Sequence, residues 1–419
     1  MQSSYVDIVI VGLGQKIFPQ ILKCIDEGQP YDEMEGVATL SEDGEFKFTP
    51  QKKFDLSGFE IPDFDAVDLD WYREESKAIL PYSKIDGVKL TGYLYYPTSF
   101  GCPFACSYCC NFSVFGGNWY GYKLENVMDQ LEYLINEKEF NCVSIIDAEF
   151  FMRVKRLESF LDEVIRRKLD FIWDAQASVK AILVLGKRGL FKKIRESGCW
   201  RMNIGAESGS QNMLDYMNKK ITREDILQAA RYLNDNKITG CFNFLFGVPA
   251  EGYHDLKETF SLAYELKKIN SNSPMPVSFY SPMPGTPIFD DSVEKEFVPP
   301  KNFEEWGEYK TNYLSLADII PWRNKRRETL VYDAMTFYIP IAVPGDIGRG
   351  TITYFNDKLQ NSPFKLFLRV AHKLALFRVK TMCFIFPFER WIFDLYCKLS
   401  KKGKYVAGIK WATKEKIEN

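Results

Sequence analysis

Histidine is nearly missing from this sequence, because only His254 and His372 occur among its 419 residues. Structural zinc sites use four ligands in a tetrahedron, drawn mainly from cysteine and histidine. With so few histidines, a zinc site completed by an imidazole has little support in this chain. A cluster of cysteines in it therefore needs a different explanation.

Long apolar runs and an excess of one charge are also lacking. No stretch of about 18 uninterrupted apolar residues occurs, so we expect no membrane-spanning helix. The first residues have no basic segment followed by an apolar one, so we expect no export signal. Lysine and arginine number 54 against 56 acidic residues, which gives no argument for nucleic-acid binding. We therefore expect a cytoplasmic protein with reduced thiols and no nucleic-acid partner.

Cysteine, in contrast, is concentrated in one place. Cys102, Cys106 and Cys109 lie in the short segment Gly-Cys-Pro-Phe-Ala-Cys-Ser-Tyr-Cys. Three thiolates in one loop can hold three corners of a cubane [4Fe–4S] cluster and leave the fourth iron without a protein ligand. Such an open iron can bind a small molecule and pass it one electron. The loop therefore favours an iron–sulfur cluster that takes part in chemistry over a zinc site or a disulfide.

Other cysteines have simpler interpretations. Cys142, Cys199 and Cys241 lie in or beside apolar, strand-like runs, where free cysteine packs as a small hydrophobic residue. Cys110 directly follows the loop and is expected to point away from its neighbour, in a supporting or structural role. Cys110 and Cys199 remain minor candidates for an additional reactive thiol.

A repeating unit of a short apolar run, a turn and an amphipathic stretch predicts the fold. The expected strands are 93–96, 143–147, 171–174, 202–205, 242–246 and 277–280, and the expected helices include 124–138, 155–168, 223–236 and 253–268. Alternating strands and helices are typical of a parallel sheet with right-handed crossovers. Six units predict an α/β fold with a partial (β/α)6 TIM-like barrel over residues 91–290. Functional residues should then lie at the carboxyl ends of its strands.

Two flanking regions differ from this core. For residues 1–90 we predict a partial Rossmann-like segment followed by a linker. Near residues 7–15 the sequence is typical of a strand, a Gly-containing turn and a helix. The third glycine of a dinucleotide-binding fingerprint is missing there. Residues 291–419 predict a mainly helical, basic and aromatic region. Its basic stretch, 363–410, could touch an anionic membrane surface. The favoured interpretation is a helical lid packed on the barrel.

Five motifs follow one another in an order that resembles the radical SAM superfamily over roughly residues 5–290. The first is the cysteine loop, with Tyr108 as its aromatic residue. The others are Ile-Asp-Ala-Glu-Phe-Phe at 146–151, Ile-Gly-Ala-Glu-Ser-Gly-Ser at 204–210, Leu-Phe-Gly-Val-Pro-Ala-Glu at 245–251 and Ser-Pro-Met-Pro-Gly-Thr-Pro at 281–287. The last is similar to the Pro-x-Pro-Gly-Thr signature of the branch associated with a cobalamin-binding domain.

The resemblance implies a cofactor and a set of binding residues. S-adenosylmethionine (SAM) would bind the open iron through its amino and carboxylate groups, and one electron from the cluster would release a 5′-deoxyadenosyl radical. The implied SAM-binding residues are Tyr108 (adenine, through its backbone), Glu207 and Gln176 (ribose), Asp147 or Glu149 (ammonium) and Lys219 (carboxylate). For each polar residue the alternative is a helix cap or a solvated loop.

Cobalamin is suggested by the branch and disfavoured by the N-terminal segment. Relatives in this branch begin with a complete cobalamin domain, whereas this chain opens at what resembles a late strand of that domain, residues 7–11. No histidine precedes His254, so we expect no histidine-ligated cobalamin from this chain.

The sequence therefore predicts a radical SAM enzyme acting on an unactivated C–H bond of a small-molecule or lipid-like substrate. A reductant such as flavodoxin or ferredoxin would supply the electron. Cobalamin-dependent methyl transfer competes with a cobalamin-free rearrangement, oxidation or cyclisation. A non-catalytic iron–sulfur or zinc protein, and a membrane-surface binding module led by the basic tail, are the alternatives from other classes.

Overall fold

Six parallel strands form the centre of the fold. The computed structural model describes residues 6–40, 44–50, 61–79, 84–85, 87–308, 319–343, 364–384 and 388–392. The central strands are β6 (Tyr93–Tyr96), β9 (Cys142–Ile145), β10 (Ile172–Ala177), β11 (Cys199–Glu207), β12 (Thr239–Phe246) and β13 (Val277–Phe279). They lie side by side in the order β13-β12-β11-β10-β9-β6, and each neighbouring pair is parallel. The predicted six-stranded partial barrel is thus confirmed.

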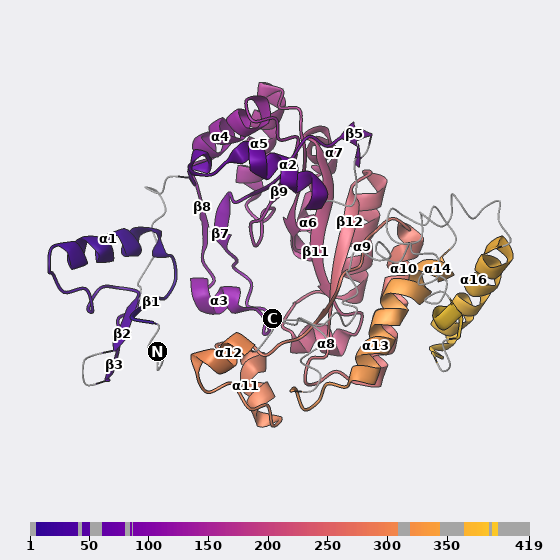
Figure 1. The fold of residues 1–419 in the computed structure, drawn as a ribbon. Coiled ribbons are helices and arrows are strands. Elements are labelled where there is room, and N and C mark those ends of the chain that lie inside the picture. Colours follow the sequence, from indigo (N-terminus) through magenta and orange to yellow (C-terminus); the bar gives the residue numbers. More distant parts are fainter. Residues whose placement is uncertain are drawn as a thin grey trace.

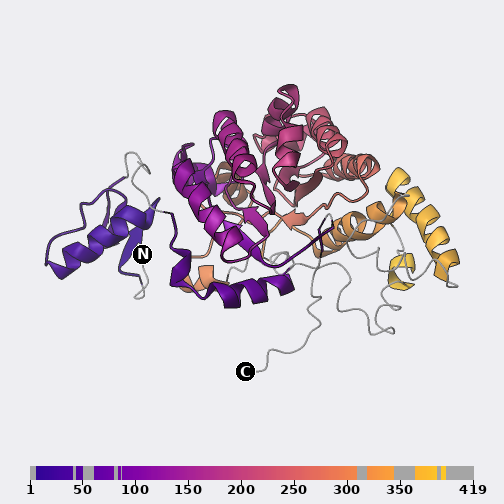
Figure 2. The same ribbon diagram turned by 90° about the horizontal axis from the view of Figure 1, so that it is seen from above.

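Helices cover one face of this sheet (Figures 1 and 2). They are α4 (Leu124–Asn136), α5 (Val154–Arg167), α6 (Val179–Lys187), α7 (Phe191–Glu196), α9 (Arg223–Asp235) and α10 (Tyr253–Ile269). The short helix α8 (Gln211–Tyr216) lies below the sheet in Figure 1, after the carboxyl end of β11. Alternate residues of β11 lie on opposite faces of the sheet and differ in burial. Met202, Ile204 and Ala206 are fully buried towards the helices, whereas Arg201 and Asn203 on the other face are half-buried. The inner face of the sheet therefore carries polar groups, and the core lies between sheet and helices.

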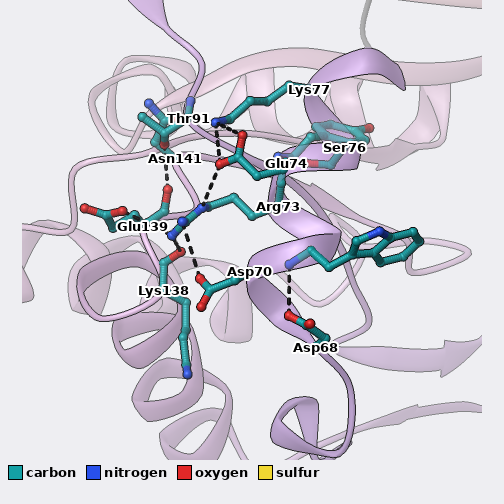
Figure 3. A network of polar contacts seen from close by, with 12 residues as sticks. Asp68, Asp70, Arg73, Glu74, Ser76, Lys77, Thr91, Lys138, Glu139 and Asn141 are labelled. Carbon is teal, nitrogen blue, oxygen red and sulfur yellow. Dashed lines mark hydrogen bonds and ion pairs between the residues drawn. The ribbon is translucent and has the colours of Figure 1, made fainter.

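Helix α2 (Leu69–Ile79) contacts the edge strand β6, and Figure 3 shows the polar contacts that this helix makes. Ser76 Oγ accepts a hydrogen bond from the backbone N–H of Tyr93 at 2.9 Å, the first residue of β6. Arg73 Nη1 donates to the carbonyl of Lys138 at 3.0 Å and pairs with Glu139 Oε2 at 3.1 Å. Since an uncovered edge strand exposes unpaired backbone groups, α2 completes the sheet on this side.

The N-terminal segment forms a small unit of its own, to the left of the sheet in Figure 1. It comprises β1 (Ile8–Ile10), α1 (Gly14–Asp26), β2 (Val37–Leu40) and β3 (Phe46–Phe48). The strand and helix expected near residues 7–15 are present. In the described residues, β1 pairs antiparallel with β2, and β2 antiparallel with β3, whereas Rossmann strands pair in parallel. In the sequence, the short elements η1 (Phe64–Ala66), β4 (Lys84–Ile85) and β5 (Val88–Lys89) come between this unit and β6.

The region after the barrel is helical, as predicted. It contains α11 (Pro287–Glu294), α12 (Phe303–Glu308), α13 (Lys325–Asp333), a π-helical turn (Ala334–Tyr338), α14 (Ile339–Ala342) and α16 (Phe364–Thr381). Among the helices that the structure describes, none is both long and apolar enough to cross a membrane. Much of the basic stretch predicted for membrane contact, residues 393–410 and 385–387, lies outside the described residues.

Two basic residues of this region are used inside the protein. Arg378 of α16 is buried and pairs with Glu389, and its guanidinium lies 5.5 Å from the ring of Tyr338. Arg390 lies 3.7 Å from Asp333 and 5.1 Å from the Phe337 ring. These contacts favour the interpretation of a packed helical region over a free basic face for the two arginines.

Candidate active site

The three cysteines lie in a loop between a short hairpin strand and a helix. β7 (Ser99–Gly101) pairs antiparallel with β8 (Trp119–Gly121), and α3 (Cys110–Phe115) follows the loop. Gly101 has φ of +78°, and a Cβ atom there would lie 2.2 Å from the carbonyl oxygen of Asn118. Only glycine therefore allows the chain to leave β7 directly into the cysteine loop.

Close groups of metal-ligating atoms can be compared with the position of the three cysteines. In the described part of the chain, the one group of His, Cys, Asp or Glu ligand atoms within 4.8 Å of one another is His254, Asp255 and Glu258. The three cysteine sulfurs therefore do not all lie within 4.8 Å of one another. The His254 group is a helix start: Asp255 accepts from Gly252 N at 2.7 Å and from Ser210 Oγ.

The protonation of these thiols depends on what they bind. Cys102, Cys106 and Cys109 are half-buried and unpaired with any other sulfur, whereas Cys110 is exposed. Burial raises the pKa of Cys102 to about 11. It also raises the pKa of Cys106, against the effect of the Lys219 ammonium. Because metal ligation requires the thiolate, iron binding here must displace protons.

Backbone hydrogen bonds fix the loop to distant parts of the barrel. Ser107 N donates to the carbonyl of Met217 at 3.1 Å, and Ser107 O accepts from Ile288 N at 3.1 Å. Asn218 Nδ2 donates to the carbonyl of Ala105 at 2.6 Å. Sequence reasoning missed Asn218, although it stands next to Lys219.

The side chains of three predicted SAM-binding residues meet beside this loop, including that of Tyr108, for which a backbone contact was predicted. Tyr108 Oη donates to Glu207 Oε1 at 2.8 Å, and Lys219 Nζ lies 3.3 Å from the same oxygen and 3.4 Å from Tyr108 Oη. Burial raises the pKa of Tyr108, and the Glu207 carboxylate adds to that effect. Burial alone would lower the pKa of Lys219, but Glu207 and Cys106 raise it overall. The site thus holds a buried carboxylate and a buried ammonium next to the cysteines.

The backbone around Glu207 is shaped for this contact. The pairing of β11 with β12 shifts between Gly205 and Glu207, as in a β-bulge, and Glu207 has φ of +61°. A Cβ on Gly205 would lie 2.2 Å from Glu207 Oε1 and 3.1 Å from Lys219 Nζ. The Glu207 carboxyl group therefore occupies space that a side chain on residue 205 would fill. A left-handed non-glycine residue at a strand end is typical of functional sites.

The remaining predicted residues have separate surroundings. Asp147 accepts hydrogen bonds from the backbone N–H groups and the hydroxyls of Thr98 and Ser99, so its carboxylate is occupied by the turn that leads into β7. Glu149 is buried and accepts from Ser178 N at 2.7 Å and Phe151 N at 3.2 Å. Gln176 is exposed on the inner face at the end of β10. Of the two ammonium candidates, Asp147 is therefore committed to the protein itself.

Glu149 allows a prediction on pH. Burial raises its pKa from the ordinary 4.5 to about 7, against the stabilising backbone N–H donors. Since the charged form is disfavoured in the folded state, the free energy of unfolding should fall as the pH rises from about 4.5 through about 7, by up to about 3 kcal/mol. We expect cluster-free Glu149→Gln to lose about 1 kcal/mol at low pH but to show a flatter pH dependence. Urea unfolding at pH 5, 6, 7 and 8 measures both, and equal slopes in the two proteins would contradict the assignment.

The central part of the chain, which holds this site, matches a known family. Residues 96–263 match the family described as the radical SAM superfamily. The chain contains a radical SAM domain. The match begins at the last residue of β6 and ends within α10, so it covers the cysteine loop, Glu207 and Lys219.

Curated relatives of this chain include a cyclase and an uncharacterized methyltransferase. The anaerobic magnesium-protoporphyrin IX monomethyl ester cyclase of Rubrivivax gelatinosus is 26% identical over 301 residues, covering 70% of this chain and 50% of the relative. An uncharacterized methyltransferase of Pyrococcus horikoshii is 25% identical over 310 residues, covering 73% and 61%. The chain thus spans about half to three fifths of these relatives.

Solved structures agree with the fold. The cobalamin-dependent S-adenosylmethionine radical enzyme OxsB, with aqua-cobalamin bound, matches with a TM-score of 0.63 at 18% identity, over 97% of this chain and 62% of that chain. The methyltransferase TsrM from Kitasatospora setae, with cobalamin and a [4Fe–4S] cluster bound, matches with a TM-score of 0.51 at 18% identity, over 70% of this chain and 54% of that chain. At this identity the likeness shows the radical SAM fold.

Proposed function

We propose that this protein is an enzyme that cleaves SAM reductively on a [4Fe–4S] cluster held by Cys102, Cys106 and Cys109, and acts on an unactivated C–H bond. The observation that carries the proposal is the position of Tyr108, Glu207 and Lys219, which meet beside the three-cysteine loop at the carboxyl edge of the sheet. When bound, the cluster and SAM together supply a carbon-centred radical.

The chain's own residues would bind and orient SAM. Glu207 offers a carboxylate suited to two ribose hydroxyls, and Lys219 offers an ammonium suited to a carboxylate. Both side chains are almost wholly buried, with 11% and 13% exposure, so water is largely excluded around them. Glu149, with backbone donors already on both oxygens, is the remaining candidate for the SAM ammonium.

The test is a single-turnover assay without oxygen. Reconstituted protein, dithionite and SAM should give 5′-deoxyadenosine, detected by mass spectrometry, together with about four iron atoms and four sulfides per chain. Stoichiometric zinc with negligible iron would identify a metal-binding protein without this activity. Iron and sulfide without 5′-deoxyadenosine would indicate a non-catalytic iron–sulfur protein.

Polar groups on the inner face of the sheet support a small-molecule substrate. Gln176, Asn203 and Asn243 lie on this face, half-buried or exposed. Lower down, Asp174 is fully buried and accepts from Asn203 Nδ2 at 2.9 Å and from Arg201 at 3.1 Å. A substrate bound along this face would find amide donors and acceptors close to the carboxyl edge.

Flavodoxin or ferredoxin is the class of reductant we expect for the reaction.

Methyl transfer with cobalamin is the version that the relatives favour, since OxsB and TsrM bind cobalamin and one curated relative is described as a methyltransferase. Titration of the purified chain with cobalamin tests it: a shift of the corrin absorption bands supports methyl transfer. An unchanged spectrum favours a cobalamin-free rearrangement, oxidation or cyclisation, the class to which the cyclase relative points.

A further inference from the structure

The segment Trp322–Arg327, beyond the six βα units, reaches back to the carboxyl end of β12. Trp322 Nε1 donates to the carbonyl of Gly247 at 2.9 Å, and Gly247 is the first residue after the strand. Glu251 Oε2 accepts from the N–H of the same Gly247 at 2.8 Å. Both backbone groups of Gly247 are therefore held by side chains, one of them from the C-terminal region.

Arg327 closes the other end of this loop. Its Nη2 lies 3.2 Å from Glu251 Oε2 and donates to the carbonyls of Glu251 at 3.0 Å and Gly252 at 3.3 Å. Glu251 is buried, whereas the Arg327 side chain is 33% exposed, and loss of Arg327 would leave a buried carboxylate without its cation. Residues 247–252 are thus fixed at their start by Trp322 and at their end by Arg327.

The clamped loop shares an apolar cluster with the cysteine loop. Val248 packs with Met213, Met217, Tyr280 and Ile288, and Tyr108 and Trp322 border the same cluster. Met217 and Ile288 are the residues whose backbones hold Ser107 of the cysteine loop. Movement of Val248 would therefore reach Tyr108, whose hydroxyl binds Glu207.

We propose that Trp322 and Arg327 are positioning residues that fix the loop 247–252 and, through the shared apolar cluster, the orientation of Tyr108 and Glu207 in the SAM site. The proposal rests on the proposed function, because SAM is the ligand whose binding they would support. Neither residue lies within the 96–263 family match, and neither was singled out from the sequence.

Three variants separate positioning from folding. Trp322→Phe keeps a ring and removes the N–H donor, and Arg327→Gln removes the cation. Arg326→Gln is the matched control, because Arg326 is the exposed neighbour in α13. In Trp322→Phe and Arg327→Gln we expect the KM for SAM in 5′-deoxyadenosine formation to rise about fivefold to tenfold, because the hydrogen bonds that each variant loses account for a change of that size. The kcat should stay within threefold of the parent, and the iron content should be unchanged. Arg326→Gln should stay within twofold of the parent.

A second measurement keeps the two proposals distinguishable. Amide hydrogen exchange of residues 247–252 should become about tenfold faster in Trp322→Phe and Arg327→Gln, and not in Arg326→Gln. Parent protein that makes no 5′-deoxyadenosine would overturn the proposed function, while exchange would still test the clamp. Active parent protein whose variants keep the parental KM would overturn the positioning role. If amide exchange of residues 247–252 were unchanged in both variants, Trp322 and Arg327 would not be the residues that fix this loop.

Discussion

Single replacement of Cys102, Cys106 or Cys109 by alanine should lower 5′-deoxyadenosine formation by more than about a thousandfold, equivalent to about 4 kcal/mol of activation free energy. Each thiolate would occupy a separate corner of the proposed cluster, and Cys110 is the one further cysteine within the adjoining residues 101–115. A two-cysteine loop cannot leave one defined open iron, so the loss should appear in the cluster itself. Iron and sulfide analysis measures the amount of intact cluster, and so does the absorbance near about 400 nm, where the thiolate-to-iron band lies.

Cys110→Ala is the matched control. Cys110 is adjacent to Cys109 in sequence, but its side chain is exposed at the first residue of α3, whereas Cys109 precedes the helix and accepts from Asn111 Nδ2 at 3.6 Å. We expect this variant to keep its iron and its activity within threefold of the parent. Loss of the cluster in Cys110→Ala with retention in Cys109→Ala would show that the ligand set has been assigned to the wrong neighbour.

The parts of the fold that follow from local sequence were predictable. The strand expected at 93–96 is β6 without change, and the strand expected at 143–147 is β9, Cys142–Ile145. Both are short apolar runs between amphipathic helices, so their type depends on few competing interactions. The cysteine loop was equally accessible, because its three sulfur ligands come from eight consecutive residues.

Contacts between distant segments were not predictable in the same way. Tyr108 and Glu207 are 99 residues apart, and their hydrogen bond depends on the bulge in β11 and on the left-handed backbone at Glu207. The contact of Trp322 with Gly247 spans 75 residues and joins the C-terminal region to a strand end. Neither follows from periodicity, because a pattern of apolar residues predicts which face is buried but not which polar groups meet.

Asp147 illustrates how the same signal can have two meanings. An acidic residue just after a buried strand was interpreted as a candidate for the SAM ammonium. The structure shows Oδ1 accepting from the N–H groups of Thr98 and Ser99 at 2.6 and 2.9 Å, and Oδ2 accepting from both hydroxyls. The polar pair Thr98-Ser99, directly after β6, was the signal in the sequence that could have suggested this partner. Asp147 therefore ties β9 to the turn that leads into β7 and the cysteine loop.

Asp147→Ala should lower the free energy of unfolding by about 3–5 kcal/mol, because it removes the acceptor of four buried donors at once. It should also lower the iron bound per chain, since the turn at residues 98–99 precedes the cysteine loop by only two residues. Urea unfolding of the cluster-free protein and iron analysis of the reconstituted protein measure the two effects. Asp170→Ala, at an exposed position, is the control and should change stability by less than about 0.5 kcal/mol.

Asp147→Asn distinguishes a hydrogen-bond acceptor from a required charge. Burial raises the pKa of Asp147, so the folded protein gains nothing from the charge as such. In the variant, the amide oxygen can still accept from the two backbone N–H groups, and the amide N–H₂ can donate to the two hydroxyls once these rotate to accept. We therefore expect Asp147→Asn to lose only about 1 kcal/mol and to keep its iron. If it were as unstable as the alanine variant, the carboxylate charge itself would be needed for the stability of the fold.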